Sequence, residues 1–253
     1  MRGIAGIAFT LVSVLACNLW ALQNAPAVPA REPYKAAQPF GQPHCNTKVA
    51  IAWFSEITGE VELASAFGKD FQKPLNHSAV SEGNIIRTGM GSAEIELEDQ
   101  STIRVGPGSV IAFPRLELLP SGNKVSSVLG LRGTIYVSLM PNYIVDTRGN
   151  DFELLFGKQQ VHLKPSGHVR LEIDHTEARL VIRDGKGQVD GPFGSMDLVK
   201  KRTFQFDLKE QSQPSVVNKV TKNPMDKWDA SAVAFHQDQI ATPGRIGARY
   251  FKP

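Results

Sequence analysis

Histidine side chains are the first candidates for chemistry in this chain. No pair of them has the i, i+4 helical spacing, or the clustering with cysteine, that zinc sites use. They are His44, His77, His162, His168, His175 and His236. His162 and His168 flank one turn and could meet across a hairpin, but we expect them to be surface residues of strands. The sequence therefore predicts no metal site and no cofactor.

Nucleophiles and carboxylates give equally weak signals. Cys45 follows His44 directly, yet both lie in a proline-rich stretch where no fixed base could hold an imidazole within hydrogen-bonding distance. Asp146, Asp151 and Glu153 lie near one loop, and a glycosidase could use two such carboxylates. Acidic residues beside turns are ordinarily solvated, however. We expect no catalytic residue, and we expect that the chain is not an enzyme.

Composition limits the possible partners. The chain has 253 residues, with 28 Lys and Arg against 25 Asp and Glu, for a net charge of +3. This charge is too small and too diffuse to predict nucleic acid as a partner. The length allows one large or two small domains with a real core.

The N-terminus carries an export signal. Arg2 is the only charge before the apolar stretch 3–22, so residues 1–25 are predicted to be a signal peptide or an N-terminal anchor. Cys17 ends a weak lipobox and is a candidate for lipidation. The proline-rich residues 26–47 are predicted to form an extended linker. We expect a periplasmic or envelope protein that associates with a membrane only through this end, if it is uncleaved or lipidated.

The clearest pattern in the body of the chain is a strict alternation. Residues 93–98 place apolar side chains on one face of a strand and three glutamates on the other. The pattern resumes at Ile103, and cross-strand partners must share a face, so the intervening loop has an odd number of residues, most simply three. Arg104 then lies beside Glu94 or Glu96 on a face that we expect to be solvent-exposed, where such a pair contributes a few tenths of a kcal/mol at most.

The same alternation continues downstream. Residues 169–173 and 178–182 form a second predicted hairpin, and the last alternating run ends near Leu208. Residues 48–208 contain no amphipathic helical period of the length that a parallel crossover needs. The predicted class is all-β, an antiparallel meander or sandwich or a solenoid-like domain of about twelve strands, with a short C-terminal helix.

Five short motifs between Gly59 and Pro107 occur in the order and spacing of the FecR domain, which this segment resembles. The matching positions are Gly59, Val61, Pro74, Gly83, Arg87, Thr88, Gly89, Asp99, Arg104, Gly106 and Pro107. Gln100 departs from the family, which usually has glycine there. A left-handed backbone at that position costs about 1 kcal/mol without glycine. Either this hairpin uses another loop geometry or it tolerates the strain.

The downstream half is similar to extended FecR-domain proteins exported by some Gram-negative bacteria. FecR proteins proper resemble envelope-spanning regulators with a cytoplasmic tail that controls a sigma factor, and only Met1 and Arg2 precede the apolar stretch here. The resemblance thus implies an exported, non-enzymatic recognition domain that binds an unknown envelope protein or glycan, with a signalling role open. The alternatives are a carbohydrate-binding or carbohydrate-degrading envelope protein, and a regulator acting through a partner.

Two groups of residues in the C-terminal part are candidate partner contacts. Residues 209–253 are predicted to be a tail with a short helix near 225–240, in which Trp228 and Phe235 share a stripe with Ala232. This stripe would pack on the β core or, alternatively, dock onto a partner. The basic cluster Lys200, Lys201 and Arg202, with Lys186 nearby, is interpreted as a charged edge strand or, alternatively, as a footprint on anionic envelope polymers.

Overall fold

The computed structural model describes residues 52–65, 70–119, 122–141, 150–210 and 212–241. The predicted signal peptide with Cys17, the linker, and Asp146 lie outside the described residues. The described part confirms the all-β class with one C-terminal helix. Its elements are β1 (Ala52–Thr58), β2 (Val61–Ala64), β3 (Ile85–Thr88), β4 (Ser92–Leu97), β5 (Thr102–Val105), β6 (Val110–Leu118), β7 (Lys124–Ser138), β8 (Asn150–Phe156), β9 (Gln159–Leu163), β10 (His168–Ile173), β11 (Glu177–Asp184), β12 (Lys186–Gly191), β13 (Gly194–Val199), β14 (Arg202–Asp207), β15 (Ser215–Val217) and α2 (Asp226–Ala241). Strand β15 lies beyond Leu208, where the last strand was expected to end.

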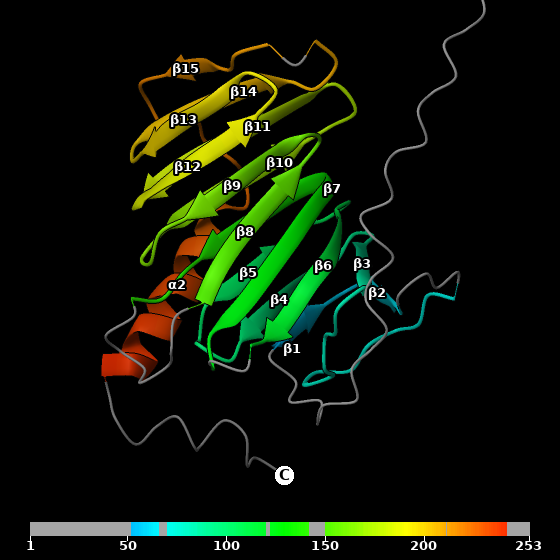
Figure 1. Ribbon diagram of the computed structural model, residues 1–253. Coiled ribbons are helices and arrows are strands. Elements are labelled where there is room, and N and C mark those ends of the chain that lie inside the picture. The colour runs from blue at the N-terminus through cyan, green and yellow to red at the C-terminus, as the bar shows by residue number, and fades with distance from the viewer. Residues whose placement is uncertain (1–51, 66–69, 120–121, 142–149, 211, 242–253) are drawn as a thin grey trace, which may run out of the picture. The chain divides into compact units, whose positions relative to one another are not determined.

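The strands form two sheets that share β7. Sheet A has the order β1-β4-β5-β7-β10-β11-β14-β15, and sheet B has the order β2-β3-β6-β7-β8-β9-β12-β13. In Figure 1, β6, β7 and β8 of sheet B lie in front of β4 and β5 of sheet A, and α2 lies at the left of the view. The β10–β11 and β14–β15 pairs lie in sheet A, whereas the β8–β9 and β12–β13 pairs lie in sheet B, so the chain passes back and forth between the two sheets.

The crossing from one sheet to the other occurs at two glycines of β7. Residues up to Arg132 pair with β6, and residues from Gly133 onward pair with β10. Gly133 has φ +94°, and a Cβ on Gly130 would lie 2.5 Å from Cδ1 of Ile173. The left-handed backbone and the close packing both require glycine here. These residues allow one 15-residue strand to belong to both sheets.

The core lies between the sheets and is built by the predicted alternation. Ile95 of β4, Leu171 of β10 and Leu180 of β11 are fully buried, as are the inward residues of sheet B. Phe156 of β8 and Phe206 of β14 contact each other edge to face, with ring centroids 5.1 Å apart. One strand pair departs from the antiparallel expectation. Strand β8 runs parallel to β7, because β7 ends in sheet A and β8 begins in sheet B level with the start of β7.

The β4–β5 hairpin confirms the predicted loop parity: the Leu97 amide donates to the Ser101 carbonyl at 2.8 Å, so residues 98–100 form a three-residue loop. The loop also retains the left-handed backbone. Ile95 pairs with Ile103, and Glu94 pairs with Arg104. Gln100 has φ +63°, in the left-handed region. Asp99 supports the turn, since its Oδ1 accepts a hydrogen bond of 3.0 Å from the Ser101 amide. Gln100 therefore adopts the left-handed backbone conformation that glycine favours, although it is not glycine.

We predict that Gln100→Gly stabilises the protein by about 0.5–1 kcal/mol, because it removes the steric cost of the left-handed conformation. Urea unfolding would measure the change. Gln213→Gly is the matched control: Gln213 is exposed and has no positive φ, so glycine there should be neutral or destabilising. Equal effects of the two substitutions would contradict the prediction.

Candidate functional site

The outer face of sheet A carries a row of polar side chains buried beneath α2. Glu94, Arg104, Tyr136 and Arg170 lie on neighbouring strands in direct register. Arg104 and Arg170 are 0% exposed, and Glu94 is 3% exposed. The expectation that Arg104 and Glu94 form a solvent-exposed pair is therefore wrong. The alternation was predicted correctly, but the helix covers the face that faces away from the core.

Arg104 is surrounded by hydrogen-bond acceptors. Its Nε donates to Oδ1 of Asp229 on α2 at 3.0 Å, and its Nη1 donates to Oε2 of Glu94 at 3.3 Å. Thr102 accepts a further bond at 2.6 Å, and Ser138 also accepts one. A buried guanidinium requires such partners, since an unpaired buried charge is very unfavourable. Two carboxylates, one from the sheet and one from the helix, thus neutralise Arg104.

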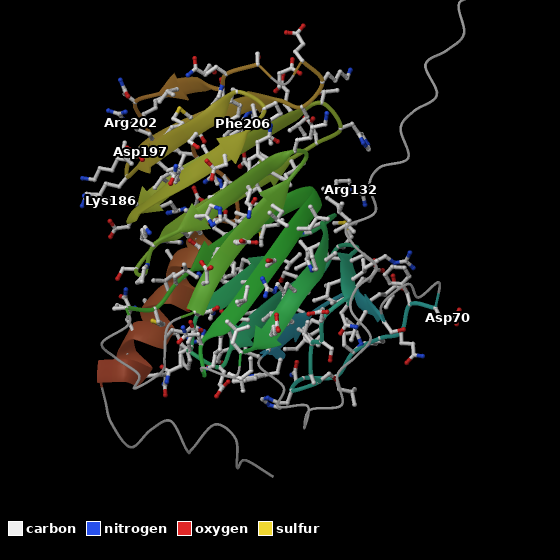
Figure 2. The ribbon with its side chains drawn as sticks, viewed as in Figure 1. Asp70, Arg132, Lys186, Asp197, Arg202 and Phe206 are labelled. Atoms are coloured by element: carbon white, nitrogen blue, oxygen red, sulfur yellow. The ribbon has the colours of Figure 1, made fainter. Side chains whose placement is uncertain are left out.

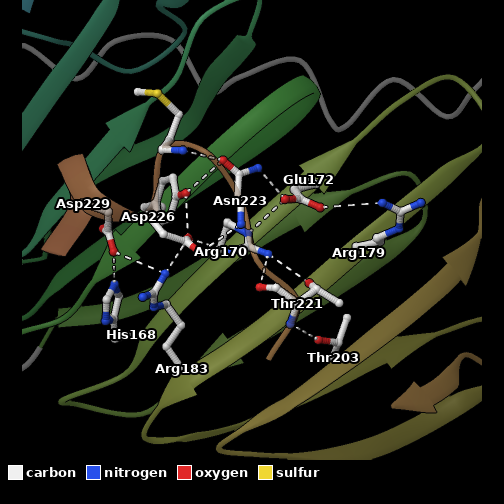
Figure 3. A network of polar contacts seen from close by, with 12 residues as sticks. His168, Arg170, Glu172, Arg179, Arg183, Thr203, Thr221, Asn223, Asp226 and Asp229 are labelled. Carbon is white, nitrogen blue, oxygen red and sulfur yellow. Dashed lines mark hydrogen bonds and ion pairs between the residues drawn. The ribbon is translucent and has the colours of Figure 1, made fainter. Parts of the chain in front are cut away.

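Arg170 makes a parallel set of contacts at the N-terminal end of the helix. Its Nη1 donates to Oδ1 of Asp226 at 2.6 Å, and its Nη2 donates to the carbonyl and hydroxyl of Thr221. Its Nε lies 3.0 Å from Oε1 of Glu172 without being aligned for a hydrogen bond. Arg183 of β11 donates to the same Asp226 oxygen at 2.6 Å. Figure 3 shows these residues converging on the start of α2.

Two histidines join helix and sheet reciprocally. His168 of β10 has Nε2 2.9 Å from Oδ2 of Asp229, and His236 of α2 has Nε2 2.9 Å from Oε1 of Glu94. His236 is buried, and the His168 side chain is only 19% exposed. The interpretation of His168 as a surface residue is therefore wrong. His162 lies on β9 in sheet B, 3.6 Å from Asp190, so the two histidines do not meet across a hairpin.

We call this set of residues the charged interface. It comprises Glu94, Arg104, Tyr136, His168, Arg170 and Arg183 on sheet A, with Asp226, Asp229 and His236 on α2. The helix begins with a local cap: the Asn223 amide donates to Asp226 Oδ2, and the Met225 amide donates to Asn223 Oδ1, both at 2.9 Å. This cap fixes the position of Asp226 against Arg170.

The buried face of α2 is polar, which the predicted aromatic stripe did not indicate. Asp229 and His236, seven residues apart, are its buried positions, whereas Trp228, Ala232 and Phe235 are half-buried on one flank. The helix packs on the β domain mainly through hydrogen bonds and ion pairs. A signal was available in the sequence, because Arg104 and Arg170 both occupy outward positions of central strands while acidic and imidazole groups repeat on one helix face.

The charged environment shifts the pKa of several groups. Burial alone raises the pKa of Glu94, but the hydrogen bond and charge of His236, the hydrogen bond from Ser55 and the charge of Arg104 together lower it to about 2. Burial and the neighbouring Asp226 carboxylate raise the pKa of Tyr136. Asp226 has a lowered pKa, since the Asn223 amide and Arg170 outweigh the effect of its burial. Both carboxylates are thus held in their charged form.

Residues of the FecR-like motifs gather at a set of turns. The Thr88 hydroxyl donates to the Gly106 carbonyl at 2.7 Å and accepts from the Ser109 amide at 2.9 Å. The Gly108 amide donates to the Gly89 carbonyl at 2.8 Å. A Cβ on Gly59 would lie 2.9 Å from the Gly91 Cα, so this turn too is tightly packed. These contacts connect the β3–β4 and β5–β6 turns.

The remaining motif residues are placed individually. Arg87 pairs with Glu62 and lies 3.8 Å from the Phe71 ring centroid. Val61 and Pro74 are buried, Gly83 has φ +79°, and Pro107 is exposed. Asp99 also accepts a hydrogen bond from Asn150 at 3.1 Å. Apart from Arg104, none of these motif residues belongs to the charged interface.

Of the other predicted site residues, the basic cluster is exposed and Glu153 is half-buried. Lys200, Lys201 and Arg202 are exposed at the β13–β14 turn, and Lys200 Nζ lies 3.7 Å from Asp184. Glu153 accepts hydrogen bonds from Ser127 and Gln160 at 2.9 Å each.

A surface hollow of about 370 Å³ lies beside the start of α2. It is lined by Gly133, Thr134, Glu172, Ile173, Asp174, Glu177, Arg179, Lys222 and Asn223. The described residues contain no cluster of His, Cys, Asp and Glu that could hold a metal ion. Within the same residues, no helix is both long and apolar enough to cross a bilayer.

Comparison with known proteins finds partial structural similarity. No family model and no curated protein matches the chain. Two crystal structures of a "putative anti-sigma factor" from Parabacteroides distasonis ATCC 8503 resemble parts of it. The first has a TM-score of 0.41 and 14% identity over 53% of this chain and 58% of its own length. The second has a TM-score of 0.45 and 13% identity over 63% of this chain and 78% of its own length.

We predict that Arg104→Met destabilises the protein by about 3–5 kcal/mol, because Glu94 and Asp229 then lose their buried counter-charge. Urea unfolding measures the loss. Arg115→Met is the matched control, since Arg115 pairs with Glu117 at the surface, with side chains 48% and 45% exposed. That substitution should cost about 1 kcal/mol or less. Similar losses for the two variants would show that burial of the charged interface does not matter.

We further predict an acid-sensitive contribution from Glu94. Its pKa falls from 4.5 in the unfolded chain to about 2 in the fold, so its contribution is fully present above pH 4.5 and is lost as pH falls through 2. The loss is on the order of 3 kcal/mol. Unfolding free energies measured from pH 5 to pH 2 should fall less steeply in Glu94→Gln than in the wild type, while Glu117→Gln, at an exposed site, keeps the wild-type slope. An unchanged slope in Glu94→Gln would refute this assignment.

Proposed function

We propose that the chain is a non-enzymatic, exported FecR-type domain that acts in the bacterial cell envelope by binding an envelope protein, with any signalling passing through that partner. One observation carries this proposal. The side chains best suited to acid–base chemistry, those of the charged interface, are engaged in holding α2 against sheet A. Arg104, Arg170 and Asp229 are fully buried there, so they serve the fold and are closed to a substrate.

The fold type in this proposal is supported by the local structure of the motifs. The hairpin at Gln100 adopts the left-handed turn that the glycine of the FecR pattern favours. Thr88, Gly89 and Gly106 are used together in closing adjacent turns. A set of short motifs spaced over fifty residues therefore has a common structural purpose, as expected of a family pattern that specifies a fold.

The recognition surface in this proposal is the outward side of α2. Lys227, Ala230, Ser231, Ala234 and Gln237 are exposed along it. The half-buried ring systems of Trp228 and Phe235 line one flank, and aromatic side chains are enriched among residues that dominate binding energy. Because the charged interface fixes the helix before binding, little conformational entropy would be lost when a partner docks.

Carbohydrate binding is the second candidate, and the hollow beside α2 favours it. Thr134, Glu172, Arg179 and Asn223 offer donors and acceptors suited to hydroxyl groups. Asp174 is held ionised, because backbone hydrogen bonds from Thr176 and Glu177 lower its pKa. These groups suit the binding of a glycan in the hollow.

A cross-linking experiment in intact cells tests the proposed function. Photo-reactive residues at 230 and 234 on α2 should capture a discrete envelope protein, whereas the same residues at the exposed positions 72 and 213 should not. Ala230→Arg with Ala234→Arg should then reduce recovery of that partner by about tenfold or more, since bulk and charge enter the interface. Gln72→Arg with Gln213→Arg adds the same charge elsewhere and should leave recovery unchanged.

Two results would contradict the proposal. Equal losses in both double variants, with unchanged thermal unfolding, would show that α2 is not the binding surface. Binding to a glycan array that is abolished by substitution of Thr134, without any captured protein, would support the second candidate instead.

A further inference from the structure

A second exposed feature lies where the turns of both sheets meet, and we call it the basic rim. It consists of Lys164, Lys186, Lys200, Lys201, Arg202 and Lys219, all exposed. One backbone hydrogen bond and one bond from a side-chain hydroxyl connect these segments. The Lys164 amide donates to the Lys186 carbonyl at 3.0 Å, and the Lys219 carbonyl accepts from Thr203, the neighbour of Arg202, at 2.8 Å. Figure 2 shows Lys186 and Arg202 projecting on the same side of the molecule.

The basic rim gathers six basic side chains at one place on the surface. Figure 2 shows one acidic residue, Asp197, near Lys186 and Arg202. A local excess of positive charge attracts an anionic surface.

The charges of the basic rim are largely uncompensated. Lys200 lies 3.7 Å from Asp184, and both side chains are more than 60% exposed. Within the described residues, the other five basic side chains form no ion pair. Lys201 also has φ +64°, a conformation that favours glycine. The turn therefore accepts both backbone strain and repulsion between like charges.

The chemistry of the rim indicates the kind of partner. Five of the six residues are lysines, which are compact point charges on flexible stems, without the fork that binds one phosphate in a bidentate manner. They project from turns at the surface, and the hollow of the site is lined by other residues. Such a surface matches many phosphates spread over a plane. Each basic residue near an anionic bilayer adds to the attraction independently.

We propose that the basic rim docks onto the phosphate-bearing headgroups of an anionic lipid bilayer. The apolar stretch 3–22 would then be a first attachment to the same bilayer and the rim a second, joined by the proline-rich residues 26–47. Linked attachments strengthen one another through their effective concentration. The domain would lie with the basic rim against the membrane.

Vesicle flotation of the full chain tests this proposal. Vesicles of phosphatidylcholine alone are compared with vesicles containing 30% phosphatidylglycerol, and the ratio of the two partition coefficients cancels the contribution of the apolar stretch. At 50 mM NaCl we expect the anionic vesicles to bind at least about tenfold more tightly, and at 0.5 M NaCl we expect this preference to disappear. Lys164→Gln with Lys186→Gln and Lys201→Gln should lower the preference about tenfold or more.

The matched control removes three exposed lysines elsewhere, by Lys73→Gln with Lys158→Gln and Lys209→Gln. This variant has the same net charge as the rim variant and should keep the anionic preference. Circular dichroism and thermal unfolding confirm that both variants fold. The absence of an anionic preference, equal losses in the two variants, or a preference that survives 0.5 M NaCl would each overturn the proposal. Rim-dependent binding to polyglutamate or duplex DNA without vesicle binding would overturn it in favour of an acidic polymer.

Discussion

The structure depends on the neutralisation of two buried arginines. Both lie on the face of sheet A that is turned away from the hydrophobic core. Arg104 and Arg170 occupy outward positions of central strands and are completely buried. A guanidinium so placed is tolerable only with acceptors on every side, and the sheet alone does not supply enough of them. Asp226 and Asp229 of α2 complete the set. The sheet therefore needs the carboxylates of the helix, and the helix needs the arginines of the sheet. Ion pairing rather than apolar burial specifies how the two elements pack.

The two-sheet architecture makes this arrangement possible. Because β7 crosses from sheet B into sheet A at Gly130–Gly133, its C-terminal half lies between β5 and β10 and brings Tyr136 between the two arginines. The row from Glu94 to Arg170 is thus a product of register across four strands. A slip of one residue in any of them would place a core side chain beneath α2 and a charge between the sheets. The polar contact with α2 is therefore possible only in the observed register of these four strands, and the contact in turn stabilises that register.

Much of the fold could be predicted from the period of two, because apolar burial acts residue by residue along each strand. The β4–β5 and β10–β11 hairpins and the loop parity followed from it, whereas the C-terminal helix followed from the helical spacing of Trp228, Ala232 and Phe235. The alternation could not predict what covers the polar face of the sheet. An arginine at an outward position, such as Arg104, gives the same sequence pattern whether water or a helix covers it. The partner residues, Asp229 and His236, are more than a hundred positions away. The spacing of aromatic residues on α2 indicated the wrong face as the buried one. Hydrophobic periodicity cannot identify the buried face of a helix that packs through charged side chains.

The distance along the chain between Arg104 and Asp229 sets an order of events. Asp229 follows Arg104 by 125 residues and Asp226 follows Arg170 by 56, so these contacts between sheet and helix form only after the α2 segment has been made. Until then, the two guanidinium groups lack their carboxylate partners on α2 and must be solvated by water. Completion of the tertiary structure is thereby coupled to synthesis of α2. A fragment that ends before α2 would expose an unsatisfied cationic surface, a feature by which quality-control machinery would distinguish it from the folded domain.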